Sequence, residues 1–347
     1  MNTIEKWAME IPQIPTATVW MLNDLAEYKG KQELFTRQSP QRLRALREHA
    51  LIESAVCSNR IEGVLIDQKR IGTVLFGQGH LQDRDEEEVR GYQEALSWIH
   101  QEKANIPLVP ETILKLHQMT RPNIWDSGKY KKDDGEIIEK HSDGRITIRF
   151  KPSSAQETPD AIKQLCRDTD RMLKSRETPA LVALAAFNLD FLCIHPFRDG
   201  NGRVSRLLLL LLMYHLGFNA GRYISLERII EQSKDRYYET LKQSSDGWHQ
   251  SRHNPWPYIN YLLHSIKMLY REFEDRFENT TIPRGEKTES VRKAILSFSG
   301  AFHINELLKE CPDTSIDMIR KILRTMRDEG LLECTGRGKQ ALWKGIR

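Results

Sequence analysis

Two apolar helical segments joined by a short polar loop constrain this chain more than any other feature of its sequence. Residues 179–194 carry apolar side chains nearly all round a predicted helix, and residues 204–216 predict a second buried helix that ends at Gly217. A helix that is apolar on every side belongs in the interior of a domain. The loop 195–201 between them contains a proline and a glycine, and a second glycine follows at position 202, so the chain must turn tightly there. We therefore expect a mainly α fold with a central helix pair.

The loop and the start of the second helix carry groups that suit phosphate chemistry. Backbone N–H groups at a helix N-terminus beside glycines form an anion site. Arg203 and Arg206 are three residues apart and so share one face of that helix, which indicates more than one phosphate group. Asp199 is expected to hold Mg²⁺ between phosphate oxygens, and His195 is a titratable base. This set predicts in-line transfer of a phosphate-containing group to a hydroxyl.

Each of these features also has an ordinary structural interpretation. A single histidine at a helix end, a Gly-Asn-Gly turn and two arginines on one helix face commonly have no chemical role. Here, however, many polar groups gather at the ends of two apolar helices, where burial without a purpose is unfavourable. That density favours the functional interpretation.

Residues 195–206 read HPFRDGNGRVSR. They resemble, at every defined position, the signature of the Fic family, His-Pro-Phe-x-Asp/Glu-Gly-Asn-Gly-Arg-x-x-Arg. The resemblance covers roughly residues 40–275 and implies transfer of AMP from ATP to Ser, Thr or Tyr hydroxyls of proteins. It implies that His195 is the base, that Asp199 binds Mg²⁺ and that Phe197 is a buried anchor of the loop. The ATP-binding residues that it implies are Asn201, Gly202 and Arg203 at the α- and β-phosphates, with Gly200 beside them, and Arg206 at the γ-phosphate. It also implies that Tyr237 or its neighbour Tyr238 lines the adenine pocket, for which ordinary core packing is at least as good an interpretation.

A second segment, residues 58–63, reads SNRIEG and lies at the end of a helix predicted from residue 40 to about residue 60. Alone it would be an ordinary helix end with Gly63 as the C-cap. Beside the loop it resembles the family's inhibitory motif, Ser/Thr-x-x-x-Glu-Gly/Asn, with Ser58 and Glu62 at the two defined positions. The resemblance implies that Glu62 pairs with Arg206 and leaves ATP misaligned, so we expect an auto-inhibited enzyme. Removal of AMP by the same site is a further activity that the sequence leaves open.

Residues 128–150 differ from the helical remainder. They are polar, and they end in Arg-Ile-Thr-Ile-Arg-Phe after Asp143-Gly144, which predicts a short β-hairpin. The hairpin resembles the family's flap. That resemblance implies that a target segment docks along residues 146–150 as an added strand.

The chain is expected to divide into an N-terminal helical region (1–105) with an inhibitory helix (about 40–63), a catalytic core (106–278), a linker (279–287) and a C-terminal domain (288–347). Three predicted helices and then a hairpin describe a winged helix. Its second half carries basic residues that match a DNA-binding footprint, namely Arg320, Lys321, Arg324, Arg327, Arg337 and Lys339. Acidic residues interrupt that face, so a protein partner is an equal alternative.

Further helices are expected at about 85–98, from 110 onward, at 158–174, 224–244 and 257–277. The acidic run 85–88 is interpreted as a first turn favoured by the helix dipole. His117 is interpreted as structural because it lacks evident partners. The five scattered cysteines indicate neither disulfides nor a zinc site. No apolar signal core and no long apolar run is present, so we expect a cytoplasmic protein without a membrane partner, whose oligomeric state stays open.

Two alternatives to an AMP transferase stay open at this stage. One is a DNA-binding regulator whose core only senses nucleotide; the presence of both His195 and Asp199 disfavours it. The other is a relative that moves UMP, phosphocholine or phosphate. The complete phosphate-binding set and Glu62 suit a triphosphate donor, so AMP leads.

Overall fold

The structure is a computed structural model. It describes the whole chain except for residues 1, 39, 78–79, 103–104, 141–145, 279–287, 289–290, 293, 296–297, 299, 312–313, 337–340 and 346–347. Its contacts group the chain into two compact units. The first comprises residues 1–32 and 44–273, and the second comprises residues 33–43 and 274–347. The predicted boundary near residue 105 stays a prediction, and the predicted linker lies outside the described residues.

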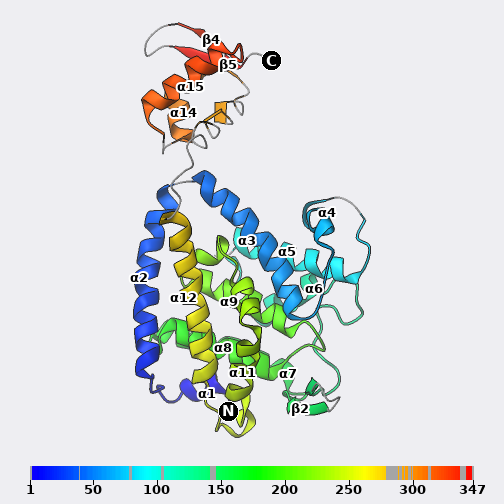
Figure 1. Ribbon diagram of the computed structural model, residues 1–347. Helices are drawn as coiled ribbons and strands as arrows, with labels where there is room; N and C mark the ends of the chain where they lie inside the picture. Colours follow the sequence, from blue (N-terminus) through cyan, green and yellow to red (C-terminus); the bar gives the residue numbers. More distant parts are fainter. Residues whose placement is uncertain are drawn as a thin grey trace. The chain divides into compact units, whose positions relative to one another are not determined.

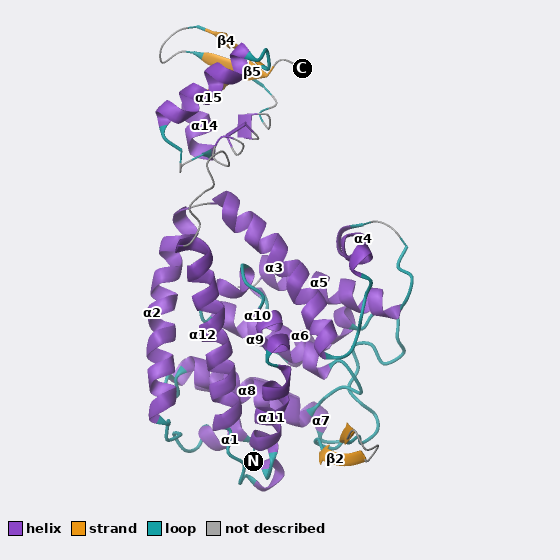
Figure 2. Ribbon diagram, in the orientation of Figure 1, coloured by secondary structure: helices purple, strands orange, loops and turns teal. Residues whose placement is uncertain are grey.

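The centre of the first unit is the helix pair that the sequence predicts. Helix α8 (Ala180–Ile194) and helix α9 (Asn201–His215) pack against each other (Figure 1). Every side chain of α8 after the first residue is buried. The mainly α character is confirmed, because among the described residues strands occur only in a small hairpin and in the C-terminal unit (Figure 2).

Three helices cover this pair and position the loop between its members. Helix α7 (Thr158–Ser175) packs along α8. Helix α5 (Arg84–Glu102) and helix α6 (Pro110–Thr120) pack on each other and on α9. Both α6 and α7 begin with a proline in the first turn, where the missing N–H has no helical partner to lose. All three lie where the sequence predicts helices.

Helix α3 (Pro40–Ile61) matches the predicted helix, and Gly63 follows it with φ 87°. Helix α2 (Thr16–Gln38) has no counterpart in the sequence-based prediction. It runs along helix α12 (Trp256–Glu278), to which it is joined by hydrogen bonds such as Thr18 to Asn260 (Figure 1). Its most buried side chains, Thr18, Leu25 and Gln32, lie seven residues apart. Two of these three are polar, so apolar periodicity does not reveal the helix.

The predicted single helix over 224–244 is wrong. The structure has a short 3₁₀ turn η3 (Ala220–Arg222), then helix α10 (Leu226–Gln232) and helix α11 (Lys234–Ser245). The break falls at Ser233, whose φ is −120° and whose hydroxyl donates to the carbonyl of Ile229. A side chain that bonds the preceding turn in this way competes with helix continuation. The remaining short elements of this unit are α1 (Thr3–Trp7), η1 (Gln68–Arg70), α4 (Ile71–Phe76) and η4 (Trp248–Gln250).

The predicted hairpin is confirmed. Strand β1 (Ile137–Lys140) pairs antiparallel with strand β2 (Ile146–Phe150) in a two-stranded sheet. The predicted turn at Asp143-Gly144 lies outside the described residues. Arg149 donates to the carbonyl of Tyr238 on α11, so the hairpin is fixed to the helical core.

In the second unit, strand β3 (Phe302–His303) precedes helices α14 (Ile304–Glu310) and α15 (Ile316–Asp328). Strands β4 (Leu332–Thr335) and β5 (Leu342–Gly345) form the predicted C-terminal hairpin, and the sheet order is β3-β5-β4. An apolar core of its own includes Val291, Phe302, Ile319, Leu323 and Leu332. No helix among the described residues is both long and apolar enough to cross a membrane.

The N-terminal segment is held to the central helix by one buried carboxylate. Asp190 of α8 is fully buried and accepts four hydrogen bonds. The donors are the N–H and hydroxyl of Thr3, the N–H of Ile4 and the indole of Trp248. A buried acceptor with this many partners leaves each donor unsatisfied when it is removed.

We therefore expect Asp190→Ala to lower the free energy of unfolding by about 3 kcal/mol, because the lost acceptor strands several buried donors. The measurement is urea unfolding followed by far-ultraviolet circular dichroism. The matched control is Asp170→Ala, which removes an exposed ion pair with Lys174 and should change the value by less than about 0.5 kcal/mol. Equal losses in the two variants would contradict this account.

Candidate active site

The loop between α8 and α9 turns through two residues with left-handed backbone conformation. His195 caps α8 with φ 52°, and Gly200 caps α9 with φ 84°. A Cβ on Gly200 would lie 3.2 Å from Cγ of Arg121 and 3.4 Å from Cδ2 of His117. Glycine therefore serves both the backbone angle and the close packing at this position.

Side chains inside the loop hold its shape. Asn201 accepts from the N–H of Phe197 at 2.9 Å and donates to its carbonyl at 2.7 Å. Phe197 is 1% exposed and stacks on His117, with ring centroids 3.9 Å apart. Phe197 is thus the buried anchor that the sequence predicts. The side chain of Asn201 closes the loop, which leaves only its backbone N–H for an anion.

His117 is structural, as predicted, but the reason given from the sequence was wrong. Its Nδ1 accepts from the N–H of Gly128 at 3.0 Å. Its Nε2 therefore carries the proton and donates to the carbonyl of Asp199 at 3.1 Å. Burial lowers the pKa of His117 to about 4, so the ring stays neutral in this role. Asp199 lies 82 positions from His117 in the sequence, so the sequence alone did not reveal this partner.

His195 is oriented as a base toward a cavity. Its Nδ1 lies 3.3 Å from the carbonyl of Leu192, which can only accept, so Nε2 keeps the lone pair. Burial lowers the pKa of His195 to about 4, and the ammonium of Lys131 acts in the same direction. The imidazole is therefore neutral at physiological pH. A cavity of about 250 Å³ is lined by His195 together with Trp125, Tyr130, Lys131, Ile137 and Arg198.

The first turn of α9 has the geometry that an anion site requires. Gly200 makes no side-chain cap bond, so the N–H groups of residues 201–203 point out of the helix end. A Cβ on Gly202 would lie only 2.1 Å from Oε1 of Glu62, so a carboxylate oxygen already sits over this turn. Nη1 of Arg206 is buried and has no hydrogen-bond partner in the described part of the chain. This Nη1 atom lies 3.2 Å from the position that a Cβ on Gly202 would occupy.

Residues at the end of α3 hold Arg206 through hydrogen bonds and an ion pair. Its Nη2 donates to Oε1 of Glu62 and to the carbonyl of Ser58, each at 2.8 Å. Its Nε donates to the hydroxyl of Ser58 at 2.8 Å. The structure thus brings together the three residues that the inhibitory motif implies. Arg206 is 2% exposed, whereas the Glu62 side chain is 26% exposed.

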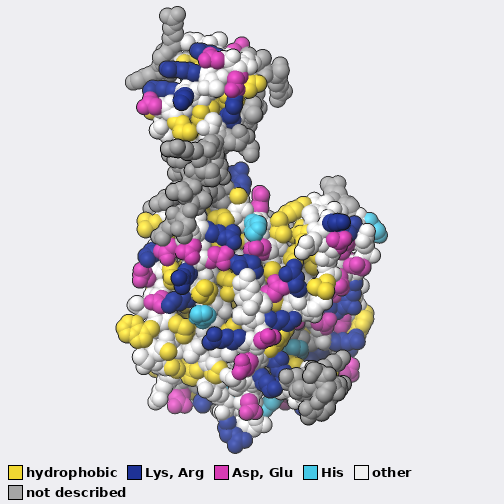
Figure 3. Space-filling view, viewed as in Figure 1, with side chains coloured by type: hydrophobic (Ala, Val, Ile, Leu, Met, Phe, Trp, Pro, Cys, Tyr) yellow, Lys and Arg dark blue, Asp and Glu magenta, His cyan; other side chains and the backbone are white. Residues whose placement is uncertain are grey.

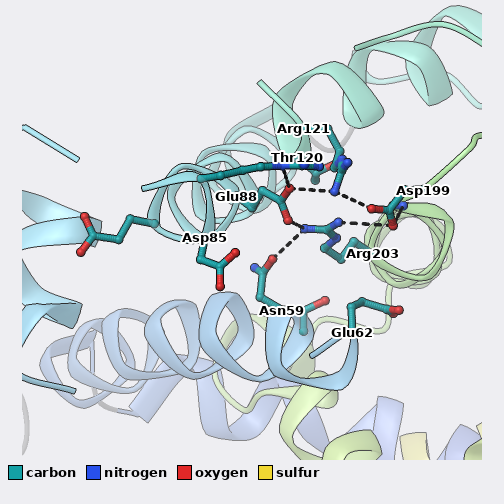
Figure 4. Close-up of polar contacts among 12 residues, drawn as sticks. Asn59, Glu62, Asp85, Glu88, Thr120, Arg121, Asp199 and Arg203 are labelled. Atoms are coloured by element: carbon teal, nitrogen blue, oxygen red, sulfur yellow. Dashed lines mark hydrogen bonds and ion pairs between the residues drawn. The ribbon is translucent and has the colours of Figure 1, made fainter. Parts of the chain in front are cut away.

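Arg203 lies in a buried network that sequence reasoning missed (Figure 4). It donates to Glu88 of α5 and, at 3.0 Å, to Oδ1 of Asn59 of α3. Glu88 also accepts from Arg121 of α6 at 2.7 Å. The interpretation of residues 85–88 as a dipole-favoured first turn is therefore incomplete, because Glu86 and Glu88 are each 3% exposed and paired with arginines. Burial of an acidic residue in a helical turn has no signature in one sequence.

Asp199 faces two of these arginines from the loop. Its Oδ2 lies 2.7 Å from Nη1 of Arg121, and its Oδ1 lies 3.8 Å from Nη2 of Arg203. Burial alone would raise the pKa of Asp199, but Arg121 and Arg203 outweigh it and the pKa is lowered. The carboxylate is therefore ionised, and its side chain is 57% exposed.

Asp199 suits a Mg²⁺ ion that arrives with a nucleotide. No group of three or more His, Cys, Asp or Glu side chains among the described residues could hold a metal alone. Mg²⁺ in nucleotide sites is usually bound through one or two carboxylates together with phosphates and waters. One exposed, ionised carboxylate beside an anion site meets that requirement.

The predicted adenine contact of Tyr237 stays a prediction. Tyr237 is 2% exposed and packs with the rings of Tyr238, Tyr258 and Tyr261, which is the environment of a core residue. The neighbouring Tyr238 is half-buried, and the guanidinium of Arg149 lies 5.2 Å from its ring centre.

Comparison with known proteins identifies the loop and the helices around it. Residues 107–213 match the model of the Fic/DOC family. The chain is 24% identical over 302 residues to a curated protein adenylyltransferase Fic of Nematostella vectensis, a match that covers 82% of this chain and 62% of that protein. The chain thus spans less than two thirds of the length of this relative.

Solved structures share the fold. A Fic family protein from Desulfovibrio desulfuricans superposes with a TM-score of 0.64 at 20% identity, over 96% of this chain and 97% of that one. A Fic domain-containing signalling protein from Bacteroides thetaiotaomicron gives a TM-score of 0.61 at 22% identity, over 75% of this chain and 98% of that one. These likenesses concern the architecture.

We expect the imidazole of His195 to titrate near pH 4 in the folded protein, because burial disfavours its charged form. The measurement is nuclear magnetic resonance of the ring carbons, assigned by comparison with His195→Gln. The control is the chain in denaturant, where histidines titrate at a pH of about 6.5. Since folding lowers this pKa, the contribution of His195 to stability is present above the unfolded pKa and is lost as the pH falls toward the folded one. Titration of the folded His195 signal near the unfolded value would refute this.

Proposed function

Because this chain carries a Fic/DOC family domain at residues 107–213, we propose that it is a transferase that moves AMP from ATP to a protein hydroxyl. The observation that carries the proposal is the arrangement of one loop. A neutral base stands at one end, an anion site with two arginines stands at the other, and an ionised carboxylate lies between them. The name of the curated relative supports AMP as the group transferred.

In the proposed reaction, Nε2 of His195 takes the proton of the acceptor hydroxyl. The hydroxyl oxygen then forms a bond to the α-phosphorus, and the bond from that phosphorus to the oxygen bridging to the β-phosphate breaks. Pyrophosphate leaves with the electron pair. The hydrogen bond from Nδ1 of His195 to the Leu192 carbonyl leaves the lone pair on Nε2, the atom that would receive the proton of the acceptor hydroxyl.

The first turn of α9 binds the phosphates in this proposal. The outward N–H groups of residues 201–203 and the guanidinium of Arg206 place donors around negative charge, and such donors stabilise the transition state most when they are fixed in advance. Mg²⁺ held by Asp199 would neutralise phosphate charge that builds on the leaving group.

Glu62 acts as the brake in this proposal. Its Oε1 pairs with Arg206 and stands over Gly202, the place where a terminal phosphate would be accepted. A carboxylate there both repels the phosphate and occupies its donor. ATP can then bind only with its γ-phosphate displaced, and a displacement of about 1 Å at a reacting centre costs roughly 10²-fold in rate.

We propose that the acceptor is a peptide segment that adds to the β1–β2 sheet. This sheet has two strands, so each strand has an outer edge, and an extended segment can pair with such an edge. Ile138 and Ile148 face each other across the hairpin and are 46% and 59% exposed, which offers apolar contacts to an incoming side chain. Ile137 of β1 and His195 line the same cavity, so a segment docked on this sheet would lie next to the base.

We expect Glu62→Gly to increase incorporation of label from α-³²P-ATP into protein by about 10²-fold, because Arg206 is released for the γ-phosphate. Intact-mass spectrometry should find an AMP-sized addition. The variant Glu62→Gly/His195→Ala should return to background, since the base is gone.

The matched control is Glu53→Ala, which removes an acidic residue of the same helix that pairs with Arg228 away from the loop. Its rate should stay within about twofold of the parent chain, as for changes remote from an active site. An addition of another mass would assign a different transferred group. Equal rates with and without Glu62 would refute its inhibitory role. Label that persists without His195 would refute the role of His195 as the base.

We also propose that the C-terminal unit binds double-stranded DNA. Its strand order β3-β5-β4, with two helices between β3 and β4, is the arrangement expected of a winged helix. The apolar face of α15 (Ile319, Ile322, Leu323 and Met326) is buried in the unit's own core. Its other face exposes Arg320, Lys321, Arg324 and Arg327 to solvent. The view in Figure 3 shows basic and acidic side chains mixed on this unit.

Two of these basic residues carry the proposal. Lys321 and Arg324 have no acidic partner within the described ranges, whereas Arg320 and Arg327 pair with Asp317 and Asp328. Exposed pairs of this kind contribute little free energy, so phosphates can replace them. The predicted wing residues Arg337 and Lys339 lie outside the described residues.

We expect the full chain to bind a duplex of arbitrary sequence with an affinity that falls as salt rises, because phosphate contacts release counterions. In Lys321→Ala/Arg324→Ala, the slope of log K against log salt should be less steep by about 1.8, as for two lost contacts. Fluorescence anisotropy measures both. The charge-matched control is Lys163→Ala/Arg167→Ala on α7, two exposed residues whose loss should leave the slope unchanged. A salt-independent affinity, or equal effects of the two pairs, would exclude phosphate recognition by α15.

A further inference from the structure

Two arginines and two carboxylates share one buried cluster beside the loop. Glu88 reaches Arg121 with Oε1 and Arg203 with Oε2, and Asp199 faces the same two arginines from the loop (Figure 4). The side chains of Arg121, Arg203 and Glu88 are 7%, 1% and 4% exposed. Asp199, at 57%, is the member of the cluster that solvent reaches.

The burial of the arginines makes their partners matter. A guanidinium that is removed from water requires a counter-ion and hydrogen-bond acceptors close by, because an unpaired buried charge is strongly unfavourable. Among the described residues, Glu88 and Asp199 are the ion-pair partners of both Arg121 and Arg203. Each arginine therefore has one buried carboxylate and one exposed carboxylate.

A divalent cation that binds through Asp199 must compete with these arginines. When Asp199 turns to the cation, Arg121 keeps its 2.7 Å contact to Glu88, and Arg203 keeps its contacts to Glu88 and Asn59. Neither guanidinium is then left without an anion. The exchange is possible because Glu88 contacts the two buried arginines through different oxygens. Oε1 contacts Arg121 and also the more exposed Arg84, and Oε2 contacts Arg203.

We propose that Glu88 is a positioning residue that frees Asp199 to bind the divalent cation of the incoming nucleotide. The inference rests on the proposed function, since it takes the loop to be a metal–nucleotide site. Glu88 touches no reacting atom; it acts through Arg121 and Arg203. Without its charge, Asp199 becomes the remaining anion for two buried cations, and the cation must separate it from both.

The experiment measures binding of Mn²⁺ in the presence of ADP by the loss of the free Mn²⁺ signal in electron paramagnetic resonance. ADP lacks the γ-phosphate that Glu62 opposes, so the unmodified chain is the parent. We expect Glu88→Gln to weaken Mn²⁺ binding by at least about tenfold, the low end of the effect of one close opposite charge on the affinity of a carboxylate for a proton. Glutamine keeps the shape but only one accepting oxygen, so one arginine loses an acceptor as well as the charge. Glu86, whose two oxygens both accept from Arg70, controls for that loss.

Glu86→Gln is the matched control. Glu86 lies on the same helix, has a side chain that is also 4% exposed, and pairs with Arg70 rather than with the cluster. Its loss should leave Mn²⁺ affinity within about twofold, although both glutamine variants lose a buried ion pair and should lower stability. Equal weakening in the two variants would mean that Glu88 only stabilises the fold, and would overturn the proposal.

A second pair of variants tests the same idea from the side of the arginines. Arg121→Gln leaves Arg203 with Glu88 and should bind Mn²⁺ at least as tightly as the parent. Glu88→Gln/Arg121→Gln leaves one arginine to Asp199 and should fall between Arg121→Gln and Glu88→Gln. This comparison keeps the test decisive if Glu88→Gln alone does not fold, because the double variant removes one charge of each sign. An identical affinity in Arg121→Gln and the double variant would overturn the role of Glu88.

The parent chain separates the two levels of the argument. If it does not retain Mn²⁺ together with ADP, the metal–nucleotide site of the proposed function fails, and this inference fails with it. If the parent binds both and Glu88→Gln binds Mn²⁺ as tightly, the proposed function stands and only the role of Glu88 is refuted.

Discussion

The burial of the two arginines of α9 is the constraint on which the rest of the structure depends. Arg203 and Arg206 are 1% and 2% exposed, yet they lie in the first two turns of the helix to which we assign the anion site. Charges at such depth require acceptors fixed in place around them. The acceptors come from α3 and α5, which are wrapped on α9 from the N-terminal part of the chain. The need to neutralise these arginines thus explains why the helices before residue 107 cover the loop.

This dependence bears on what the matched family segment can do alone. Residues 107–213 contain His195, Asp199 and both arginines. The hydrogen-bond acceptors of the two arginines, namely Ser58, Asn59, Glu62 and Glu88, lie outside that segment. Asp199, which lies 3.8 Å from Arg203, is inside it. The matched segment therefore carries the reactive groups, and the preceding helices carry the groups that orient or oppose them. Under the proposed function, inhibition by Glu62 and positioning by Glu88 therefore both come from the helices that precede residue 107.

Much of this arrangement could be predicted from the sequence because it is local. The loop 195–206 is one continuous motif, and the alternation before Phe150 marks the hairpin within a few residues. Glu62 could be found because its motif has fixed internal spacing. Glu88 and Arg121 could not, since their importance arises from contacts across 115 and 78 positions to Arg203 and Asp199. Helix α2 was missed for a related reason, since it is buried through polar as well as apolar side chains at long spacing.

Lys131 ties the hairpin side of the cavity to the end of α8. Its ammonium donates to the carbonyls of Ile194 and His195, each at 3.0 Å, and its backbone N–H donates to the carbonyl of Pro196 at 2.9 Å. Only five residues separate it from the start of β1 at Ile137. A segment that pairs with the hairpin would therefore bind five residues along the chain from the lysine that holds the backbone carbonyl of His195. Under the proposed chemistry, discrimination among acceptors would be expressed in how fast a bound segment reacts as well as in how tightly it is held.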